Sequence, residues 1–210
     1  MRISKLIRVS VLTVLLGWLM SMTMVQAAAP QNNPVALLQY IANNMIAQLK
    51  EHKATLKNNR EFVYRLARNY VVPYADKDEM AKRVLPPRVW ESATPAQKEK
   101  FKSQFTTLLI RTYASALTAY EDQTIQFYGV RGGYEGRNTV EVRSEITSSQ
   151  SQPIQVSYRL VNVGGAWRLY DMSVEGVDML ESFRAQFADI LAQGGGIDQL
   201  LQRLSSHNNR

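Results

Sequence analysis

The side chains in this sequence best suited to chemistry are two acids at the end of a predicted strand, Asp171 and Glu175. A strand carboxylate that points into an apolar cavity has a raised pKa and can act as a general base. The same acids can instead accept hydrogen bonds that fix a turn of the chain before Gly176. We favour this structural role and keep a general base centred on Asp171 as an alternative.

Other residues that support catalysis or metal binding are scarce. His52 and His207 lie in polar stretches without a second histidine at ligand spacing, and the chain contains no cysteine. The Gly194–Gly196 triplet follows a predicted helix and has no lysine behind it, so it predicts a helix end rather than a phosphate-binding loop. No catalytic residue, metal ligand or cofactor is predicted, and we expect a protein that is not an enzyme.

The first 27 residues have the layout of a secretory signal peptide. A basic start precedes an apolar run over residues 9–20, and Val25-Gln26-Ala27 forms a small-residue cleavage site. The apolar run is short for a membrane span, so an uncleaved anchor is the less favoured alternative. Cleavage after Ala27 leaves residues 28–210, a length that fits a single domain.

The net charge of the sequence is +7, and three of its cations belong to the first 27 residues. We expect the remaining cations to be spread along helix faces rather than collected in runs with interleaved aromatics. This distribution disfavours nucleic-acid binding. Mild attraction to anionic lipid surfaces stays open.

The spacing of apolar residues predicts a helical part over residues 33–121. Helices are expected to start behind Asn33, Asn59 and Asp76, which are suitable capping residues. The longest helix is predicted from Pro95 to Tyr120, roughly 39 Å, because a threonine N-cap and a capping-box glutamine flank its start.

The apolar period then changes from 3.6 to 2, which predicts a sheet over residues 123–175. About four antiparallel strands are expected, with Gly132-Gly133 and Gly164-Gly165 at hairpin turns. Past Gly176 the helical period returns, and C-terminal helices are predicted over residues 177–205. The order of helices, strands and helices indicates an α+β fold with helices on one face of the sheet.

Several stretches of the chain resemble the MlaC, or toluene-tolerance, family of periplasmic phospholipid-binding proteins. They are Ser92 to Lys98, Phe105 to Leu117 and Trp167 to Val177, together with Pro73-Tyr74 and Gly196-Ile197-Asp198. The resemblance covers essentially the whole chain after the leader, although the strands between residues 123 and 151 diverge more.

The resemblance implies a curved, cone-like sheet of the nuclear-transport-factor type, packed with helices around an apolar pocket for phospholipid. It implies a periplasmic carrier between an outer-membrane lipoprotein–porin complex and an inner-membrane ATP-binding-cassette transporter with a ring-forming MCE subunit. Such a carrier maintains the lipid asymmetry of the outer membrane, and its phospholipid is cargo rather than cofactor. A periplasmic lipoprotein chaperone and a small cone-like enzyme using Asp171 remain as alternatives.

The spacing of apolar residues, and the side of the helix or strand on which each is expected to lie, give eleven candidates for the wall of this pocket. The long helix contributes Leu109, Tyr113 and Leu117; the sheet contributes Val142, Val156, Tyr158, Tyr170, Met172 and Val174; and the corner after the sheet contributes Val177 and Met179.

Overall fold

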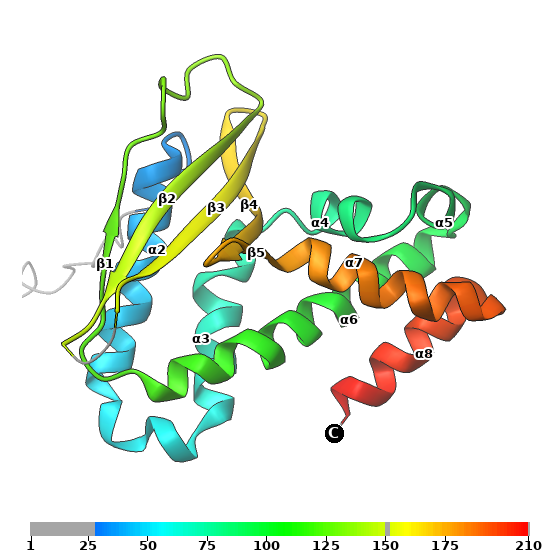
Figure 1. Cartoon of the computed structure of the whole chain (residues 1–210), viewed down its shortest axis with the longest axis horizontal. Helices are drawn as coiled ribbons and strands as arrows, with labels where there is room; N and C mark the ends of the chain where they lie inside the picture. The colour runs from blue at the N-terminus through cyan, green and yellow to red at the C-terminus, as the bar shows by residue number, and fades with distance from the viewer. Residues whose placement is uncertain (1–27, 150–151, 210) are drawn as a thin grey trace, which may run out of the picture.

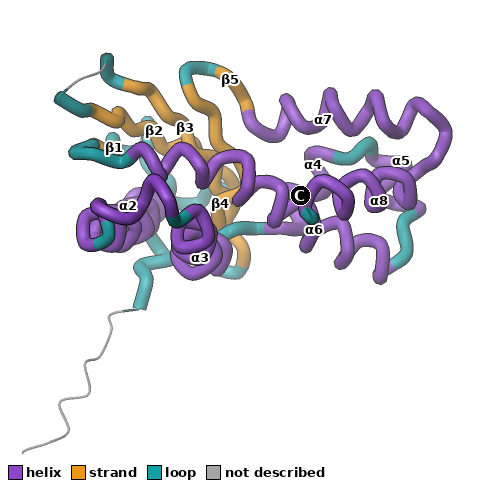
Figure 2. The backbone as a smooth tube through the Cα atoms, turned by 90° about the horizontal axis from the view of Figure 1, so that it is seen from below, coloured by secondary structure: helices purple, strands orange, loops and turns teal. Residues whose placement is uncertain are grey.

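The molecule has a sheet part and a helical part that meet at one edge of the sheet (Figure 1). The computed structural model describes residues 28–149 and 152–209, and the predicted signal peptide over residues 1–27 lies outside these ranges. Seen from below, α2 and α3 lie together beside the sheet, whereas α6, α7 and α8 extend away from it (Figure 2). No helix of the described part is both long enough and apolar enough to span a bilayer.

Capping side chains start the N-terminal helices where the sequence predicts them. These helices are α2 (Pro34–Glu51), α3 (Arg60–Tyr70), α4 (Lys77–Val84) and the short α5 (Pro87–Ser92). The side chains of Asn33, Asn59 and Asp76 accept hydrogen bonds from backbone N–H groups in the first turns of α2, α3 and α4. Helix α5 was not predicted; Pro87 opens it, because a proline is well tolerated at the first helical position.

The longest helix ends earlier than predicted. Helix α6 covers Pro95–Tyr113, and the chain continues as a tighter 3₁₀ helix over Ala114–Ala119. In a 3₁₀ helix, residues three apart lie on one face. Ala114, Leu117 and Tyr120 have this spacing, and all three pack against α3, which explains the change of winding.

The sheet has five antiparallel strands in the order β1-β2-β3-β4-β5. They are β1 (Thr124–Phe127), β2 (Thr139–Thr147), β3 (Ile154–Val163), β4 (Ala166–Val174) and the two-residue β5 (Val177–Asp178). Gly164-Gly165 forms the predicted tight turn with both φ angles positive. Gly132-Gly133 instead lies inside the longer connection over residues 128–138. Glu175 and Gly176 turn the chain into β5, which the sequence did not predict as a strand.

The C-terminal helices are α7 (Met179–Ile190) and α8 (Gly196–Asn208). The predicted break between them is confirmed: Gly194 has a φ angle of 92°, which a helix does not contain. The mixed α+β class is therefore confirmed, with one more short strand than expected.

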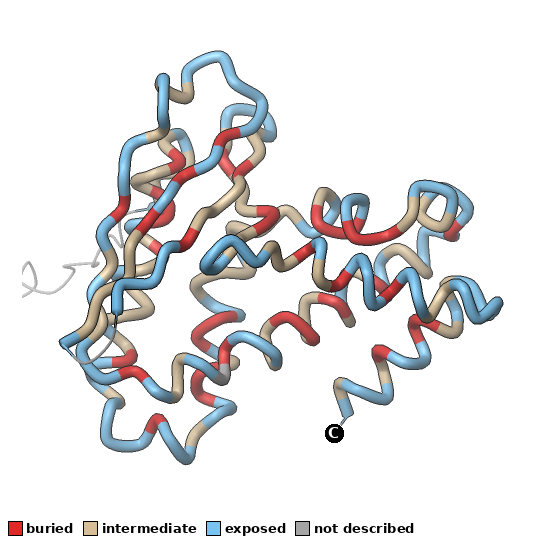
Figure 3. Tube along the Cα trace, in the orientation of Figure 1, coloured by how far each residue is buried: buried red, intermediate tan, exposed pale blue. Residues whose placement is uncertain are grey.

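The buried apolar side chains form three clusters, and Figure 3 marks the buried positions along the backbone. The helical cluster joins α4, α6, α7 and α8, and its centre is a group of four rings, Phe101, Phe105, Phe183 and Phe187. The sheet cluster packs α2 on β2, β3 and β4. The α3 cluster joins the end of α2, α3 and the 3₁₀ helix after α6. A domain of this size more often has one continuous core.

Candidate functional site

Part of the sheet carries apolar side chains that belong to none of the three clusters. Residues paired across antiparallel strands share a face, so Val156, Val174 and Val177 form one row across β3, β4 and β5. Ile146 and Ile154 pair beside them, and Met172 pairs with Tyr158. We call Ile146, Ile154, Val156, Met172, Val174 and Val177 the pocket face.

The pocket face combines buried and exposed side chains. Val156 is only 2% exposed, whereas Val174 is 37% and Val177 66% exposed. The tip of the β4–β5 turn stands out as an exposed stretch beside the start of α7 (Figure 3). Apolar side chains exposed next to each other on one surface are uncommon outside binding sites.

Tyr113 lies where α6, α7 and the sheet approach one another. Its ring packs edge-on against Phe183 of α7, with the centroids 6.3 Å apart, and 40% of the residue is exposed. Burial of the ring and the nearby carboxylate of Asp171 raise the pKa of the Tyr113 hydroxyl. This tyrosine therefore stays neutral, and its part-exposed ring lies near Asp171 of β4.

The structure divides the eleven predicted pocket residues among several places. Val156, Met172, Val174 and Val177 lie together on the pocket face, with Tyr158 next to Met172. Val142 is fully buried in the sheet cluster against α2. Leu117 packs on the α3 cluster, and Leu109, Tyr170 and Met179 pack in or on the helical cluster.

A β-bulge explains the position of Tyr170. Arg159 pairs with Asp171 and Leu160 pairs with Leu169, so Tyr170 has no partner on β3. Its ring lies in the helical cluster, where the guanidinium of Arg83 is 4.4 Å from the ring centroid. Simple alternation along β4 cannot reveal this shift of facing.

A buried polar pair adjoins the pocket face and was not predicted. Ser144 is fully buried on β2, and its hydroxyl donates a 3.4 Å hydrogen bond to the Tyr158 hydroxyl of β3. Burial raises the pKa of Tyr158, and the bond from Ser144 opposes this only in part. A serine in an otherwise apolar register, between Val142 and Ile146, is the sequence signal for this site.

Beside the pocket face, one arginine joins two carboxylates at the corner where the sheet passes into α7. The Arg159 guanidinium donates to Asp171 at 2.6 Å and also to Asp178. Asp171 additionally accepts hydrogen bonds from the backbone N–H groups of Met172, at 2.8 Å, and Leu180, at 3.2 Å. We call Arg159, Asp171 and Asp178 the corner clamp, because it ties β3 and β4 to the start of α7.

The pKa values of the two acids of the clamp are shifted in opposite directions. Burial, followed by the neighbouring charge of Asp178, raises the pKa of Asp171. Burial opposes ionisation of Asp178 as well, but the N–H of Glu181 and the Arg159 guanidinium together lower its pKa. Asp178 is thus the more stably charged acid, and it also caps α7 through the Glu181 N–H.

The two acids singled out in the sequence, Asp171 and Glu175, have different hydrogen-bond partners. Glu175 is exposed and accepts a hydrogen bond from the backbone N–H of Gln155, away from Asp171. Both acids nevertheless fix the corner, as the structural interpretation proposes. Asp171 is 3% exposed and its two oxygens already receive three donors, so the general-base alternative finds no support in this geometry.

Neither of the two histidines belongs to the corner clamp. His52 ends α2 and its ring packs against Phe62, with the centroids 4.3 Å apart, so it is less exposed than expected. His207 is exposed on α8. Within residues 28–149 and 152–209, no group of three or more acids or histidines is arranged to hold a metal ion.

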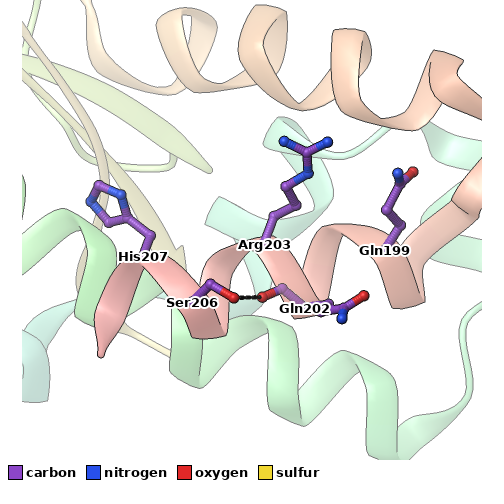
Figure 4. Close-up of a pocket in the computed structure, with 5 residues that line it drawn as sticks. All are labelled: Gln199, Gln202, Arg203, Ser206 and His207. Carbon is purple, nitrogen blue, oxygen red and sulfur yellow. Dashed lines mark hydrogen bonds between the residues drawn. The ribbon is translucent and has the colours of Figure 1, made fainter. Parts of the chain in front are cut away.

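Two surface hollows stand out, and most of the residues that line them are polar or charged. One, of about 470 Å³, lies along a single face of α8 and is lined by Gln199, Gln202, Arg203, Ser206 and His207 (Figure 4). The other, of about 430 Å³, lies over the corner clamp and includes Tyr170 among its lining residues. Neither hollow includes a residue of the pocket face.

Comparison with known proteins gives consistent matches. The family described as MlaC protein matches residues 39–206. The toluene tolerance protein ttg2D of Pseudomonas putida is 27% identical over 162 residues, which cover 77% of this chain and 74% of that protein. The intermembrane phospholipid transport system binding protein MlaC of Haemophilus influenzae is 28% identical over 195 residues, 91% of this chain and 90% of the relative.

A solved structure has the same fold. It is a phospholipid-binding protein from Ralstonia solanacearum in complex with a phospholipid. The two structures align with a TM-score of 0.76 and 29% sequence identity, over 84% of this chain and 97% of the other.

Proposed function

Since this chain belongs to the MlaC protein family, we propose that it is a phospholipid carrier whose pocket face contacts the acyl chains of its cargo. The observation that carries the proposal is the row Val156, Val174 and Val177, which continues the apolar face of the sheet beyond every packed cluster. The phospholipid complex of the Ralstonia protein supports it, because that protein shares the fold and more than a quarter of the aligned residues.

The energetics of lipid transfer require an enclosed binding site. Each buried methylene contributes about 0.8 kcal/mol, so the roughly thirty methylenes of two acyl chains amount to about 24 kcal/mol. A carrier must match most of this free energy with its own apolar contacts, or the lipid stays in the bilayer. In this proposal the acyl chains lie against the pocket face, while the head group remains in water.

We propose that the cargo enters by a movement of the helical part relative to the sheet. The helical cluster reaches the sheet through Tyr170 of β4, and Met45 packs on both other clusters, so this movement must keep or exchange those contacts. The β4–β5 turn and the corner clamp connect these parts, so we assign the hinge to residues 175–178. Tyr113 and Val177 are both exposed, and we place the opening of the proposed pocket between them.

In the cell, the proposed carrier works in the periplasm. The leader over residues 1–27 directs export and is removed after Ala27, which leaves one phospholipid-binding domain over residues 28–210. The carrier then exchanges phospholipid between an inner-membrane ATP-binding-cassette transporter with its ring-forming MCE subunit and an outer-membrane lipoprotein–porin complex. It performs no catalysis and needs no cofactor.

The test of the cargo is to purify the protein from its host and identify what an organic extract contains by mass spectrometry. We expect phospholipid with weak head-group preference, because the head group projects into water. Acylated peptides in place of free phospholipid would identify a lipoprotein chaperone instead. An extract without lipid, from protein that remains folded, would contradict the carrier.

A further inference from the structure

The net positive charge of the folded chain comes from one stretch, in contrast to the even spread along helix faces expected from the sequence. Residues 28–210 contain 22 Lys and Arg and 18 Asp and Glu, a net charge of +4. Residues 50–68 alone contain six Lys and Arg and two Glu, which is also +4. The remainder of residues 28–210 is therefore neutral overall.

The cations of this stretch gather at one end of the molecule. They lie on the end of α2, the 3₁₀ helix Lys53–Asn58 and the start of α3, at the bottom of the view in Figure 1. The basic end is defined by five exposed side chains, Lys50, Lys53, Lys57, Arg60 and Arg65. None of the five forms an ion pair in the described part of the chain; Arg68 does so, with Glu61.

The basic end continues onto the helix that borders the pocket face. The guanidinium of Arg111, on α6, lies 5.9 Å from the centroid of the Tyr64 ring on α3. Arg65 lies 5.7 Å from the centroid of the Phe62 ring. Tyr113, at the opening of the proposed pocket, follows Arg111 by two residues in the last turn of α6.

The composition of the basic end favours a fluid anionic surface over a folded protein. Protein–protein interfaces bury an apolar centre and are depleted in lysine. The basic end has three lysines, and none of the large apolar side chains exposed in the described chain belongs to residues 50–68. A bilayer of anionic lipids supplies charge without demanding a complementary shape, and it attracts each nearby Lys or Arg.

We propose that the basic end adsorbs the protein on the surface of an anionic phospholipid bilayer. This contact places the last turn of α6, with Tyr113, near the membrane, so that lipid has a short path to the pocket face. The surface lies outside the pocket, so the inference is tested separately from the cargo.

The experiment is co-sedimentation of the purified protein with vesicles of phosphatidylcholine alone, or of equal parts phosphatidylcholine and phosphatidylglycerol. The test variant is Lys53→Gln with Lys57→Gln and Arg60→Gln. The matched control, Lys82→Gln with Arg88→Gln and Lys100→Gln, removes the same charge from exposed side chains on α4, α5 and α6. Each cation near an anionic bilayer strengthens binding about fivefold, so the test variant should bind about a hundredfold more weakly.

The expected result is binding to phosphatidylglycerol vesicles only, loss of this binding in the test variant or at high salt, and retention in the control. Equal losses in both variants would show an effect of net charge alone and overturn the proposal. Absence of wild-type binding to phosphatidylglycerol vesicles would overturn it as well. If the three substitutions then weakened binding to an acidic protein partner instead, the basic end would be a protein-docking surface and not a membrane-binding one. Phospholipid extracted from the test variant shows whether the cargo site survives independently.

Discussion

Two regions of this molecule are equally apolar in sequence but differ in how they are packed. In the helical cluster, Phe105 contacts Phe101, Phe183 and Phe187, and it is 2% exposed. On the pocket face, Val174 and Val177 remain exposed beside a buried valine. The apolar side chains of the first region are buried against one another, whereas part of the second region remains exposed.

The difference teaches that apolar content does not identify a lipid-binding surface, but incomplete packing does. A side chain inside a finished core stabilises the fold, and its loss leaves a cavity. A side chain on the pocket face contributes little to folding and much to cargo. Substitutions in the two regions should therefore separate stability from lipid binding.

The largest expected effect on stability belongs to the helical cluster. Phe105→Ala should lower the free energy of unfolding by about 3–5 kcal/mol, because it removes the central ring of the four. Urea unfolding followed by circular dichroism measures this loss. A change below about 1 kcal/mol would mean that this cluster is not a finished core.

The corner clamp between the two regions should show an intermediate effect. Asp171→Ala leaves the N–H groups of Met172 and Leu180 and the Arg159 guanidinium without this acceptor, so we expect a loss of about 1–3 kcal/mol. The matched control is Glu175→Gln, which changes an exposed acid and should stay within about 0.5 kcal/mol. Equal losses in both variants would refute the role of the clamp.

The same clamp gives a prediction for pH. The pKa of Asp171 is raised above its ordinary 3.8, so the folded state holds this proton more tightly and the group favours folding less as pH rises above that value. The pKa of Asp178 is lowered, so its stabilisation is present above 3.8 and is lost as pH falls below it.

Asp171→Asn should therefore make stability rise more steeply with pH above 3.8, whereas Asp178→Asn should flatten the loss of stability below that value. Urea unfolding of both variants across acidic pH measures the two slopes. Slopes that change in the same direction would contradict the opposite pKa shifts.

The turn that carries the proposed hinge should show a smaller effect. Gly176 has a φ angle of +79°, so Gly176→Ala should cost about 1 kcal/mol through backbone strain alone. Gly129→Ala serves as the control, since Gly129 has no such φ angle and equally open surroundings. Thermal unfolding of both variants distinguishes strain from any general effect of removing a glycine, and equal midpoints would argue against strain at the turn.

The elements of this fold were predictable where local chemistry decides them. Asn33, Asn59 and Asp76 start helices because each side chain caps its own backbone, and alternation along β2 and β3 marks one packed face. The end of α6 was predicted too late, because its 3₁₀ winding depends on packing against α3. Local periodicity carries no information about that contact.

The site was predictable only in part for the same reason. Met172 and Val174 follow the period of one strand and pair with Tyr158 and Val156, while the turn at Glu175-Gly176 brings Val177 opposite Val174. Tyr170 does not follow this period, because a bulge turns it into the helical cluster. The corner clamp was not predicted, since Arg159 of β3 joins Asp171 and Asp178, which sequence spacing does not connect.

The smallest expected effect on stability belongs to the pocket face. Val174→Glu places a charge on a residue that is already 37% exposed, so unfolding should change by no more than about 0.5 kcal/mol. The matched control is Val163→Glu. Val163 is 51% exposed and is the last residue of β3, whereas Val174 pairs with Val156 near the start of that strand. Urea unfolding should leave both variants close to the wild type, and a large loss in Val174→Glu alone would make Val174 a core residue.

The most direct test of the central claim is the phospholipid content of these two variants. Mass spectrometry of organic extracts, normalised to folded protein, should find phospholipid in the wild type and in Val163→Glu but not in Val174→Glu. A carboxylate on the pocket face cannot be buried against acyl chains without a large desolvation cost. Phospholipid retained in Val174→Glu at the wild-type ratio would contradict the assignment of the pocket face.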